Sequence, residues 1–399
     1  MSSKLTSLRF PKDFLWGTAT AGHQVEGNNI HSDWWAWEKK KPEIENSGIT
    51  CDHYHKFRQD LWLAKNILQN NAYRFSIEWA RVEPKEGKFD EKEIKHYLEV
   101  LLELKKLRMK SMVTLHHFVN PLWFARKGGW EKRQNLKYFE RYVKVCLENL
   151  GDLVDFWAPI NEPGMYVSQA FLFGIWPPEK KSFTSMVRVY LNMAKAHKAA
   201  YEIIHERLSN SKVLPVISMN SYVVENYPKK LLARAFNFFT NHSFLYLVKN
   251  HFDFIGINYY GPFETNFISF GKGLDTVSGI NWKIYPKGIY EIVKEIWQKY
   301  KTPIMITENG NADANDSKRS EYIINHLFWL NKAIKEGVDV RGYFYWSLMD
   351  NFEWHMGRGV RFGLFEIDYK TLKRIPRKSA YMYGKIAVNN GVDDHLLVK

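Results

Sequence analysis

Short apolar runs alternate with longer amphipathic segments along most of the chain. Eight apolar runs have the length of buried strands: Phe14–Thr20, Ala72–Ser76, Ser111–Leu115, Val154–Ile160, Val213–Met219, Phe252–Asn258, Ile304–Thr307 and Val340–Trp346. Between them, apolar residues at three-to-four spacing predict helices over Phe57–Gln69, Glu91–Leu107, Leu136–Leu150, Met186–Leu208, Ile289–Tyr300 and Ser320–Gly337. Strand–helix alternation repeated eight times favours a closed parallel barrel over an open sheet. We therefore predict an α/β fold, a single (β/α)8 TIM barrel with elaborated βα loops over residues 1–399.

Polar and aromatic side chains follow nearly every predicted strand. In a barrel, reactive residues come from the carboxyl ends of the strands, so these side chains are expected to meet at one rim. Strand ends also meet water, and solvation alone would explain part of the pattern. The residues at successive strand ends are His23, Gln24 and Glu26; Arg74, Ser76 and Glu78; His116 and His117; Asn161 and Glu162; Asn220; Asn258, Tyr259 and Tyr260; Glu308 and Asn309; and Trp346 to Trp354.

Two of these strand ends carry a glutamate followed by a turn residue. Glu308 lies between the apolar run Ile304–Thr307 and Asn309-Gly310, a strong turn signal, and Glu162 precedes Pro163. A lone carboxylate in such a place is usually a solvated loop or helix-capping residue. Two carboxyl groups at two strand ends are what hydrolysis of a glycosidic bond needs, one as acid and one as base or nucleophile.

Composition narrows the class of protein. A length of 399 residues with 45% apolar content could form two or three domains, but a barrel with loop insertions fits equally well. Two cysteines, Cys51 and Cys146, cannot build a disulfide framework and suggest a reducing compartment. Neither a signal peptide nor a run long enough to span a membrane is evident in the sequence, so we expect a soluble, cytoplasmic protein.

The net charge of +14 raises the question of an anionic partner. The basic residues form short clusters scattered along the chain, and no nucleic-acid-binding motif is found, so neither nucleic acid nor a membrane is expected as a partner. His116 and His117 lack the accompanying Cys, His or Asp spacing of a zinc site, so we expect no metal and no cofactor. Aromatic content is 16%, with 15 tryptophans, and flat rings with polar edges suit sugar binding, although most aromatics simply pack in cores.

The chain resembles glycoside hydrolase family 1, the β-glucosidase and β-galactosidase family, over almost its whole length. The resemblance is carried by spaced motifs in the family's order: Phe14 to Thr20 with Gln24 and Glu26, Tyr73 to Ser76, His117 to Pro121, Asn161 to Pro163, Asn258 to Tyr260, Ile306 to Gly310, Trp346 to Trp354 and Arg361 to Leu364. The resemblance implies that Glu308 is the nucleophile and Glu162 the acid/base.

The same resemblance places further residues at the site. It implies that Arg74 and Tyr260 reach Glu308, with Asn258 beside them in the catalytic group. Hydrogen bonds to sugar hydroxyls are expected from Gln24, His117, Asn161 and Glu353 and from the indole of Trp354, and Trp346 is expected to stack on the sugar ring. The expected substrate is a small β-glycoside or oligosaccharide.

The mechanism depends on how far apart the two carboxyl groups lie. Retention of configuration needs a separation of about 5 to 5.5 Å, and inversion about 6.5 to 9.5 Å, and the sequence does not distinguish them. The resemblance implies retention, with a covalent glycosyl-enzyme on Glu308. The charge of Glu308 should keep Glu162 protonated until the ester forms, after which Glu162 can act as the base.

Other barrel glycanases and a non-catalytic sugar-binding barrel are the alternatives. The presence of both Glu162 and Glu308 argues against the non-catalytic barrel. An end wall formed by Glu353 and Trp354 argues against a glycanase with an open cleft, because it favours a closed pocket for one terminal sugar. The resemblance then implies an exo-acting enzyme for β-D-glucosides, and also β-galactosides and β-fucosides. An ionised Glu353 would repel a sugar phosphate.

Three features depart from the family pattern. His23 replaces a frequent Tyr, Gly261 replaces a frequent Thr, and the stretch between Asn220 and Asp253 is short. Since loops carry the surface beyond the first sugar, these departures leave the aglycone preference open. The sequence also leaves open the ranking of the sugars and the oligomeric state.

Overall fold

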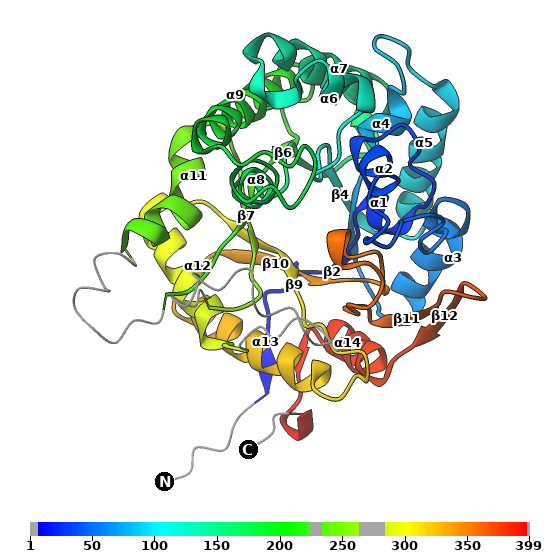
Figure 1. Ribbon diagram of the computed structural model, residues 1–399. Helices are drawn as coiled ribbons and strands as arrows, with labels where there is room; N and C mark the ends of the chain where they lie inside the picture. Colours follow the sequence, from blue (N-terminus) through cyan, green and yellow to red (C-terminus); the bar gives the residue numbers. More distant parts are fainter. Residues whose placement is uncertain (1–6, 223–233, 263–283, 397–399) are drawn as a thin grey trace.

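The strands form one curled parallel sheet, enclosed by helices (Figure 1). The structure is a computed structural model and describes residues 7–222, 234–262 and 284–396. The sheet contains β2 (Leu15–Ala19), β3 (Ala72–Ser76), β4 (Lys110–Thr114), β5 (Phe156–Ala158), β6 (Lys212–Val213), β7 (Val216–Ser218), β8 (Ile255–Asn258), β9 (Ile304–Asn309) and β10 (Val340–Trp346). Their order is β6-β5-β4-β3-β2-β10-β9-β8-β7.

The sheet closes because its two edge strands are halves of one strand position. Two residues, Leu214 and Pro215, separate β6 from β7. β6 pairs with β5 and β7 pairs with β8, while Val216 also bridges to Asn161 beyond the end of β5. Eight strand positions therefore surround one axis, and the predicted (β/α)8 TIM barrel is confirmed.

All eight predicted strands are present with shifts of a few residues at their ends. The strands are almost wholly buried, which explains their near-continuous apolar sequences. Inside the barrel, residues from most strands form one apolar cluster that includes Ala19, Met112, Met305 and Phe344. A second, larger cluster fills the space between the strands and the surrounding helices. The barrel interior is thus filled below the rim.

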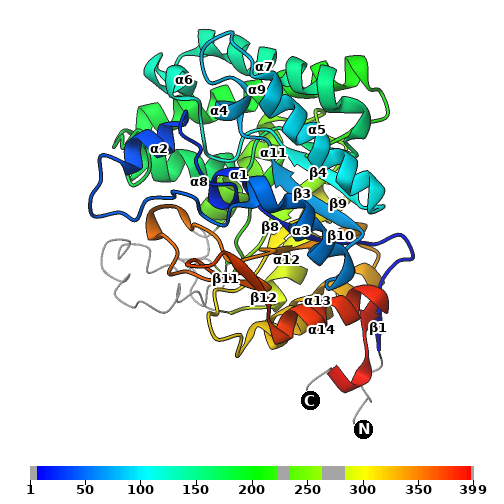
Figure 2. The same ribbon diagram turned by 90° about the vertical axis from the view of Figure 1, so that its right-hand side faces the viewer.

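The six predicted helices are also present. They are α3 (His53–Asn66), α5 (Glu91–Lys106), α7 (Leu136–Leu150), α9 (Phe183–Arg207), α12 (Lys287–Tyr300) and α13 (Arg319–Lys335), and they surround the sheet in both views (Figures 1 and 2). α7 buries Leu136, Phe139, Val143, Leu147 and Leu150, the spacing that predicted it. Local signals fix some ends, since the Asp90 carboxylate accepts hydrogen bonds from the first backbone amides of α5.

Smaller elements complete the barrel. α1 (Gly22–Val25), α2 (Asp33–Glu38) and α8 (Pro163–Val167) lie in the loops that follow β2 and β5. The hairpin β11 (Phe365–Asp368) and β12 (Lys373–Pro376) leads to α14 (Lys378–Val388). β1 (Leu8–Arg9) pairs with β13 (Gly391–Val392), so both ends of the described chain lie on the same side of the barrel (Figure 2).

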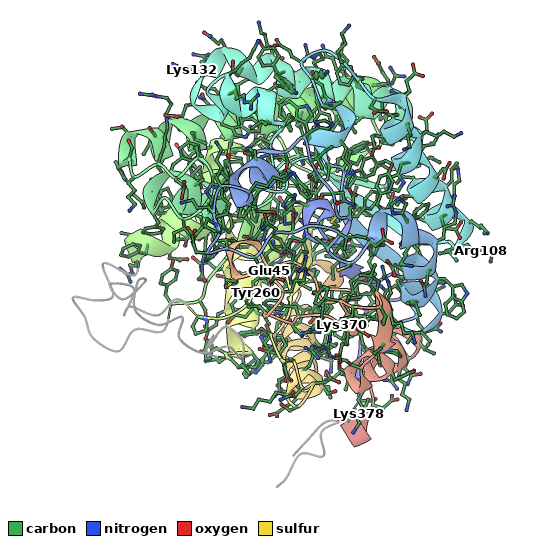
Figure 3. All side chains as sticks on the ribbon, turned by 45° about the vertical axis from the view of Figure 1, so that its right-hand side comes forward. Glu45, Arg108, Lys132, Tyr260, Lys370 and Lys378 are labelled. Carbon is green, nitrogen blue, oxygen red and sulfur yellow. The ribbon has the colours of Figure 1, made fainter. Side chains whose placement is uncertain are left out.

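Charged side chains are spread around the molecule rather than gathered in one stripe. Arg108, Lys132 and Lys378 point outward from well-separated parts of the outline (Figure 3). Across the described ranges, no helix has both the length and the apolar character needed to cross a membrane.

Candidate active site

Glu308 lies at the end of β9, buried, with a partner on each carboxylate oxygen. Oε1 accepts a hydrogen bond from Arg74 Nη1, and Oε2 accepts one of 2.6 Å from the Tyr260 hydroxyl. Burial and the neighbouring Glu308 carboxylate raise the pKa of Tyr260 well above its usual range, so its hydroxyl stays a donor. Gly310 keeps the following turn close, because a Cβ there would meet the Trp346 carbonyl oxygen at 1.8 Å.

Glu162 occupies the turn between β5 and α8. Its φ is +40°, and Pro163 begins the helix directly after it, so the glutamate is held at a sharp change of chain direction. Its amide donates to the Val216 carbonyl at 2.8 Å, and its Oε1 accepts a hydrogen bond from Asn258 Nδ2 at 2.7 Å. Burial, followed by the charge of Glu308, raises the pKa of Glu162 to about 8.

Arg74 and two asparagines connect the two glutamates. Arg74 Nη2 donates to Asn161 Oδ1 at 2.7 Å, and Asn258 Nδ2 also contacts that oxygen at 3.3 Å while it binds Glu162. Asn258 lies beside Glu308 in the pairing of β8 with β9. Glu162 and Glu308 therefore share one buried hydrogen-bond network, and of these two glutamates it is Glu308 that pairs with the Arg74 guanidinium.

Three flat rings form one wall of the rim. The His117 ring lies nearly parallel to both Trp346 and Trp354, with centroid distances of 6.0 and 6.1 Å and interplanar angles of 17° and 16°. Burial, with Arg74 nearby, lowers the pKa of His117 well below its usual range, so the ring is neutral. Its Nε2 faces Asn161 Nδ2 at 3.3 Å, whereas its buried Nδ1 has no hydrogen-bond partner among the described residues.

Gln24 joins α1 to the segment that follows β10. Its Nε2 donates to Asn351 Oδ1, the Phe352 carbonyl and Glu353 Oε2 at 3.1, 2.9 and 3.2 Å. Its Oε1 is buried and, within the described ranges, has no partner. Such unpaired polar atoms are costly unless a ligand satisfies them, and sugar hydroxyls can donate to Gln24 Oε1 and pair with His117 Nδ1.

Glu353 is the third carboxyl group of the rim. Burial, with a smaller contribution from Glu308, raises its pKa to about 8, and the hydrogen bond from Gln24 partly opposes this. Near neutral pH the group is therefore mainly protonated. The charge repulsion that the sequence suggested against sugar phosphates would act only at higher pH, which corrects that argument.

The structure also separates His116 from its neighbour. His116 Nε2 contacts Asn120 Oδ1 at 3.1 Å, its ring packs edge-on against Trp130 and Tyr166, and burial lowers its pKa to about 3. It is a core histidine, while His117 faces the rim. Among the described residues, no group of three or more His, Cys, Asp or Glu side chains is placed to hold a metal.

Two residues next to the site were missed as partners. His23 stacks on Trp354 at 5.9 Å with an interplanar angle of 6°, and its Nε2 contacts Glu38 Oε1 at 2.9 Å. Glu38 carries no sequence signal for this role. Of the other two departures from the family pattern, Gly261 lies within the described residues. In the short stretch between Asn220 and Asp253, residues 223–233 lie outside them.

Known proteins resemble this chain in sequence and in fold. A solved structure of a β-glycosidase from Pyrococcus horikoshii is similar with a TM-score of 0.90 and 40% identity, covering 98% of this chain and 97% of that one. β-Glucosidase A of Thermotoga maritima is 31% identical over 97% of this chain and 99% of its own. A 6-phospho-β-galactosidase of Clostridium acetobutylicum is 30% identical over 96% and 98%. The model of glycosyl hydrolase family 1 matches residues 6–248 and 222–392, and the chain, a glycosidase, belongs to that family.

Proposed function

We propose that the protein is a retaining, exo-acting β-glycosidase that hydrolyses terminal β-D-glucosides, and also β-galactosides and β-fucosides, by double displacement. The observation that carries the proposal is the unequal surroundings of two buried glutamates. Glu308 is paired with Arg74 and Tyr260, whereas burial beside Glu308 raises the pKa of Glu162 to about 8. A carboxylate nucleophile and a neutral carboxylic acid are the two groups that the first step requires.

In the first step, the Glu308 carboxylate attacks the anomeric carbon and the bond to the glycosidic oxygen breaks. Glu162 gives its proton to that oxygen, so the aglycone leaves as an alcohol and a glycosyl ester remains on Glu308. In the second step, water attacks the anomeric carbon, Glu162 takes a proton from the water, and the Glu308 carboxylate is released. Two inversions leave the sugar in its original β configuration.

The aromatic wall and the unpaired polar atoms support recognition of one sugar. Trp346 would stack on the ring, and Gln24, His117 and Asn161 would bind hydroxyls together with Glu353 and the Trp354 indole. The relatives include enzymes named for unphosphorylated and for phosphorylated sugars, and Glu353 does not decide between them by charge at neutral pH. We propose unphosphorylated substrates on the strength of the resemblance in Trp346–Trp354.

The remaining parts of the proposal concern the whole chain. We propose one catalytic domain over residues 1–399, with no metal or cofactor in the mechanism. The two free cysteines, Cys51 and Cys146, are both buried and fit a cytoplasmic location.

The decisive experiment follows the configuration of the first product. Proton NMR during hydrolysis of an aryl β-glucoside should show the β-anomer of glucose first, before mutarotation produces the α-anomer. Early α-glucose would refute retention. A panel of aryl β-gluco-, galacto-, fuco-, manno- and 6-phosphoglucosides would rank the sugars, and release of internal oligosaccharides from a β-glucan would favour a glycanase instead.

A further inference from the structure

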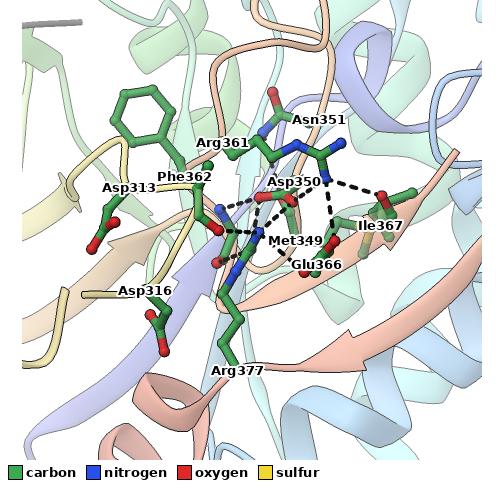
Figure 4. Close-up of polar contacts among 12 residues, drawn as sticks. Asp313, Asp316, Met349, Asp350, Asn351, Arg361, Phe362, Glu366, Ile367 and Arg377 are labelled. Carbon is green, nitrogen blue, oxygen red and sulfur yellow. Dashed lines mark hydrogen bonds and ion pairs between the residues drawn. The ribbon is translucent and has the colours of Figure 1, made fainter. Parts of the chain in front are cut away.

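An ionic cluster of the buried Asp350 and Arg377 and the partly exposed Arg361 anchors the segment that follows β10 (Figure 4). Asp350 is fully buried, and each of its two carboxylate oxygens accepts two hydrogen bonds. Oδ1 receives Arg377 Nη1 and the Gly363 amide, each at 2.9 Å, and Oδ2 receives Arg377 Nη2 at 2.9 Å and Arg361 Nη1 at 3.0 Å. Arg377 thus forms a bidentate ion pair with Asp350 through its two terminal guanidinium nitrogens.

The cluster joins three parts of the chain that are distant in sequence. Arg377 immediately precedes α14, and its Nη1 also donates to the Gly363 carbonyl at 2.7 Å. The Asp350 amide donates to the Phe365 carbonyl at 2.9 Å, and a Cβ on Gly363 would lie 2.0 Å from that same amide. The approach is therefore so close that the backbone at Asp350 has little room to shift.

Directly after Asp350, the chain makes its contacts with the sugar-binding rim. Asn351, Phe352 and Glu353 each accept a hydrogen bond from the Gln24 amide nitrogen, and Trp354 completes the ring wall with a φ of +52°. Glu353 lies three residues beyond the carboxylate that Arg377 holds. A tilt of the segment at Asp350 would consequently move Glu353 and Trp354 together.

We infer that Arg377 is a positioning residue for sugar binding, acting through Asp350 to fix the placement of Glu353 and Trp354 at the rim. The inference deepens the proposed function and rests on it, since it takes Glu353 to be a sugar contact. Among the described residues, Arg377 makes its polar contacts with Asp350, Glu366 and the carbonyls of Gly363 and Ala314, and none of these groups lies at the sugar-binding rim. Its effect should therefore depend on Glu353, which a purely stabilising ion pair would not show.

A matched control exists in the same region. Arg374 on β12 forms a bidentate ion pair with Asp60 of α3, and both residues are buried. Arg374 Nε lies 2.7 Å from Asp60 Oδ1, and Nη2 lies 2.8 Å from Oδ2. This pair lies outside the segment between Asp350 and Trp354. Arg374→Gln should lower the melting temperature much as Arg377→Gln does, without changing sugar recognition.

The test is a double-mutant cycle measured as kcat/KM on an aryl β-glucoside. We expect Arg377→Gln to lower kcat/KM at least tenfold, Glu353→Ala to lower it at least tenfold, and the two together to lose little more than Glu353→Ala alone. Arg374→Gln should change kcat/KM less than threefold. Arg377→Lys keeps the positive charge but cannot make the paired hydrogen bonds of a guanidinium. It should therefore lose less kcat/KM than Arg377→Gln.

Two outcomes would overturn the inference while the proposed function stands. One is an Arg377→Gln variant that behaves like Arg374→Gln, and the other is losses from Arg377→Gln and Glu353→Ala that multiply independently. If Glu353→Ala leaves kcat/KM unchanged, Glu353 is not a sugar contact, and both the inference and that part of the proposed function fail. Should Arg377→Gln not fold, Arg361→Gln removes a single bond to Asp350 from a more exposed side chain and should give a smaller loss with the same dependence on Glu353.

Discussion

Neutralising Glu308 should make Glu162 more acidic. The pKa of Glu162 stands at about 8 because of burial first and the charge of Glu308 second. Two unit charges at the spacing of about 5 to 5.5 Å needed for retention interact by about 3 kcal/mol at an effective dielectric constant of 20, or a little over two pH units. Glu308→Gln keeps the shape of the side chain and removes its charge. The pKa of Glu162 should then fall to near 6, still above its ordinary value because burial persists.

Carbon-13 NMR of glutamate-labelled protein would measure this change, with Glu162→Gln used to assign the signal. The comparison variant is Glu353→Gln, because the interaction with Glu162 is a smaller influence on the pKa of Glu353 than burial or Glu308, and it should shift the pKa of Glu162 much less than Glu308→Gln does. An unaltered Glu162 titration in Glu308→Gln would refute the electrostatic coupling. It would also remove the reason why Glu162 can change from acid to base once Glu308 is esterified.

Three further predictions test the separate roles. Glu308→Gly should lose turnover of an aryl β-glucoside by several orders of magnitude, since no covalent ester can form, and wild-type-like rates would exclude Glu308 as nucleophile. Glu162→Ala should slow substrates with poor leaving groups by about 10²- to 10⁴-fold more than activated aryl glycosides, and equal losses would remove it from the acid role. Because its folded pKa is raised, Glu162 should stabilise the protein fully below about pH 4.5 and progressively less as the pH rises to about 8. Chemical unfolding should therefore show a smaller fall in stability between pH 5 and 8 for Glu162→Gln, by about 2 kcal/mol or more, and an identical fall in both proteins would contradict the raised pKa.

The barrel could be predicted because its strands are short, buried and separated by amphipathic helices. Periodicity reports burial directly, so the starts of β3 and β10 and both ends of α7 agree with the predicted ranges. The break between β6 and β7 was not predicted, since Pro215 interrupts an otherwise continuous apolar run. The pairing of β1 with β13 is equally invisible, because it joins two-residue strands at opposite ends of the chain.

The site could be predicted in its residue types but not in its pairings. Glu162 and Glu308 stood out as carboxylates at strand ends, yet the contact between Arg74 and Glu308 spans 234 residues of sequence and was expected only from the resemblance. His23 with Glu38, and Asp350 with Arg377, follow no local pattern. The tertiary fold decides which charged groups lie close together, and this proximity, with burial, sets the pKa values of the carboxyl groups at the rim.

The distribution of charge is compatible with the proposed retaining mechanism in so buried a site. Before reaction, Arg74 and ionised Glu308 balance each other, while the raised pKa values of Glu162 and Glu353 keep those groups mainly neutral near pH 7. When the proposed ester forms, the charge on Glu308 disappears as Glu162 gives up its proton, so one carboxylate replaces another beside the same guanidinium network. Net charge in the site is unchanged through both steps. The fold therefore never has to bury an extra unpaired charge, which would cost several kcal/mol.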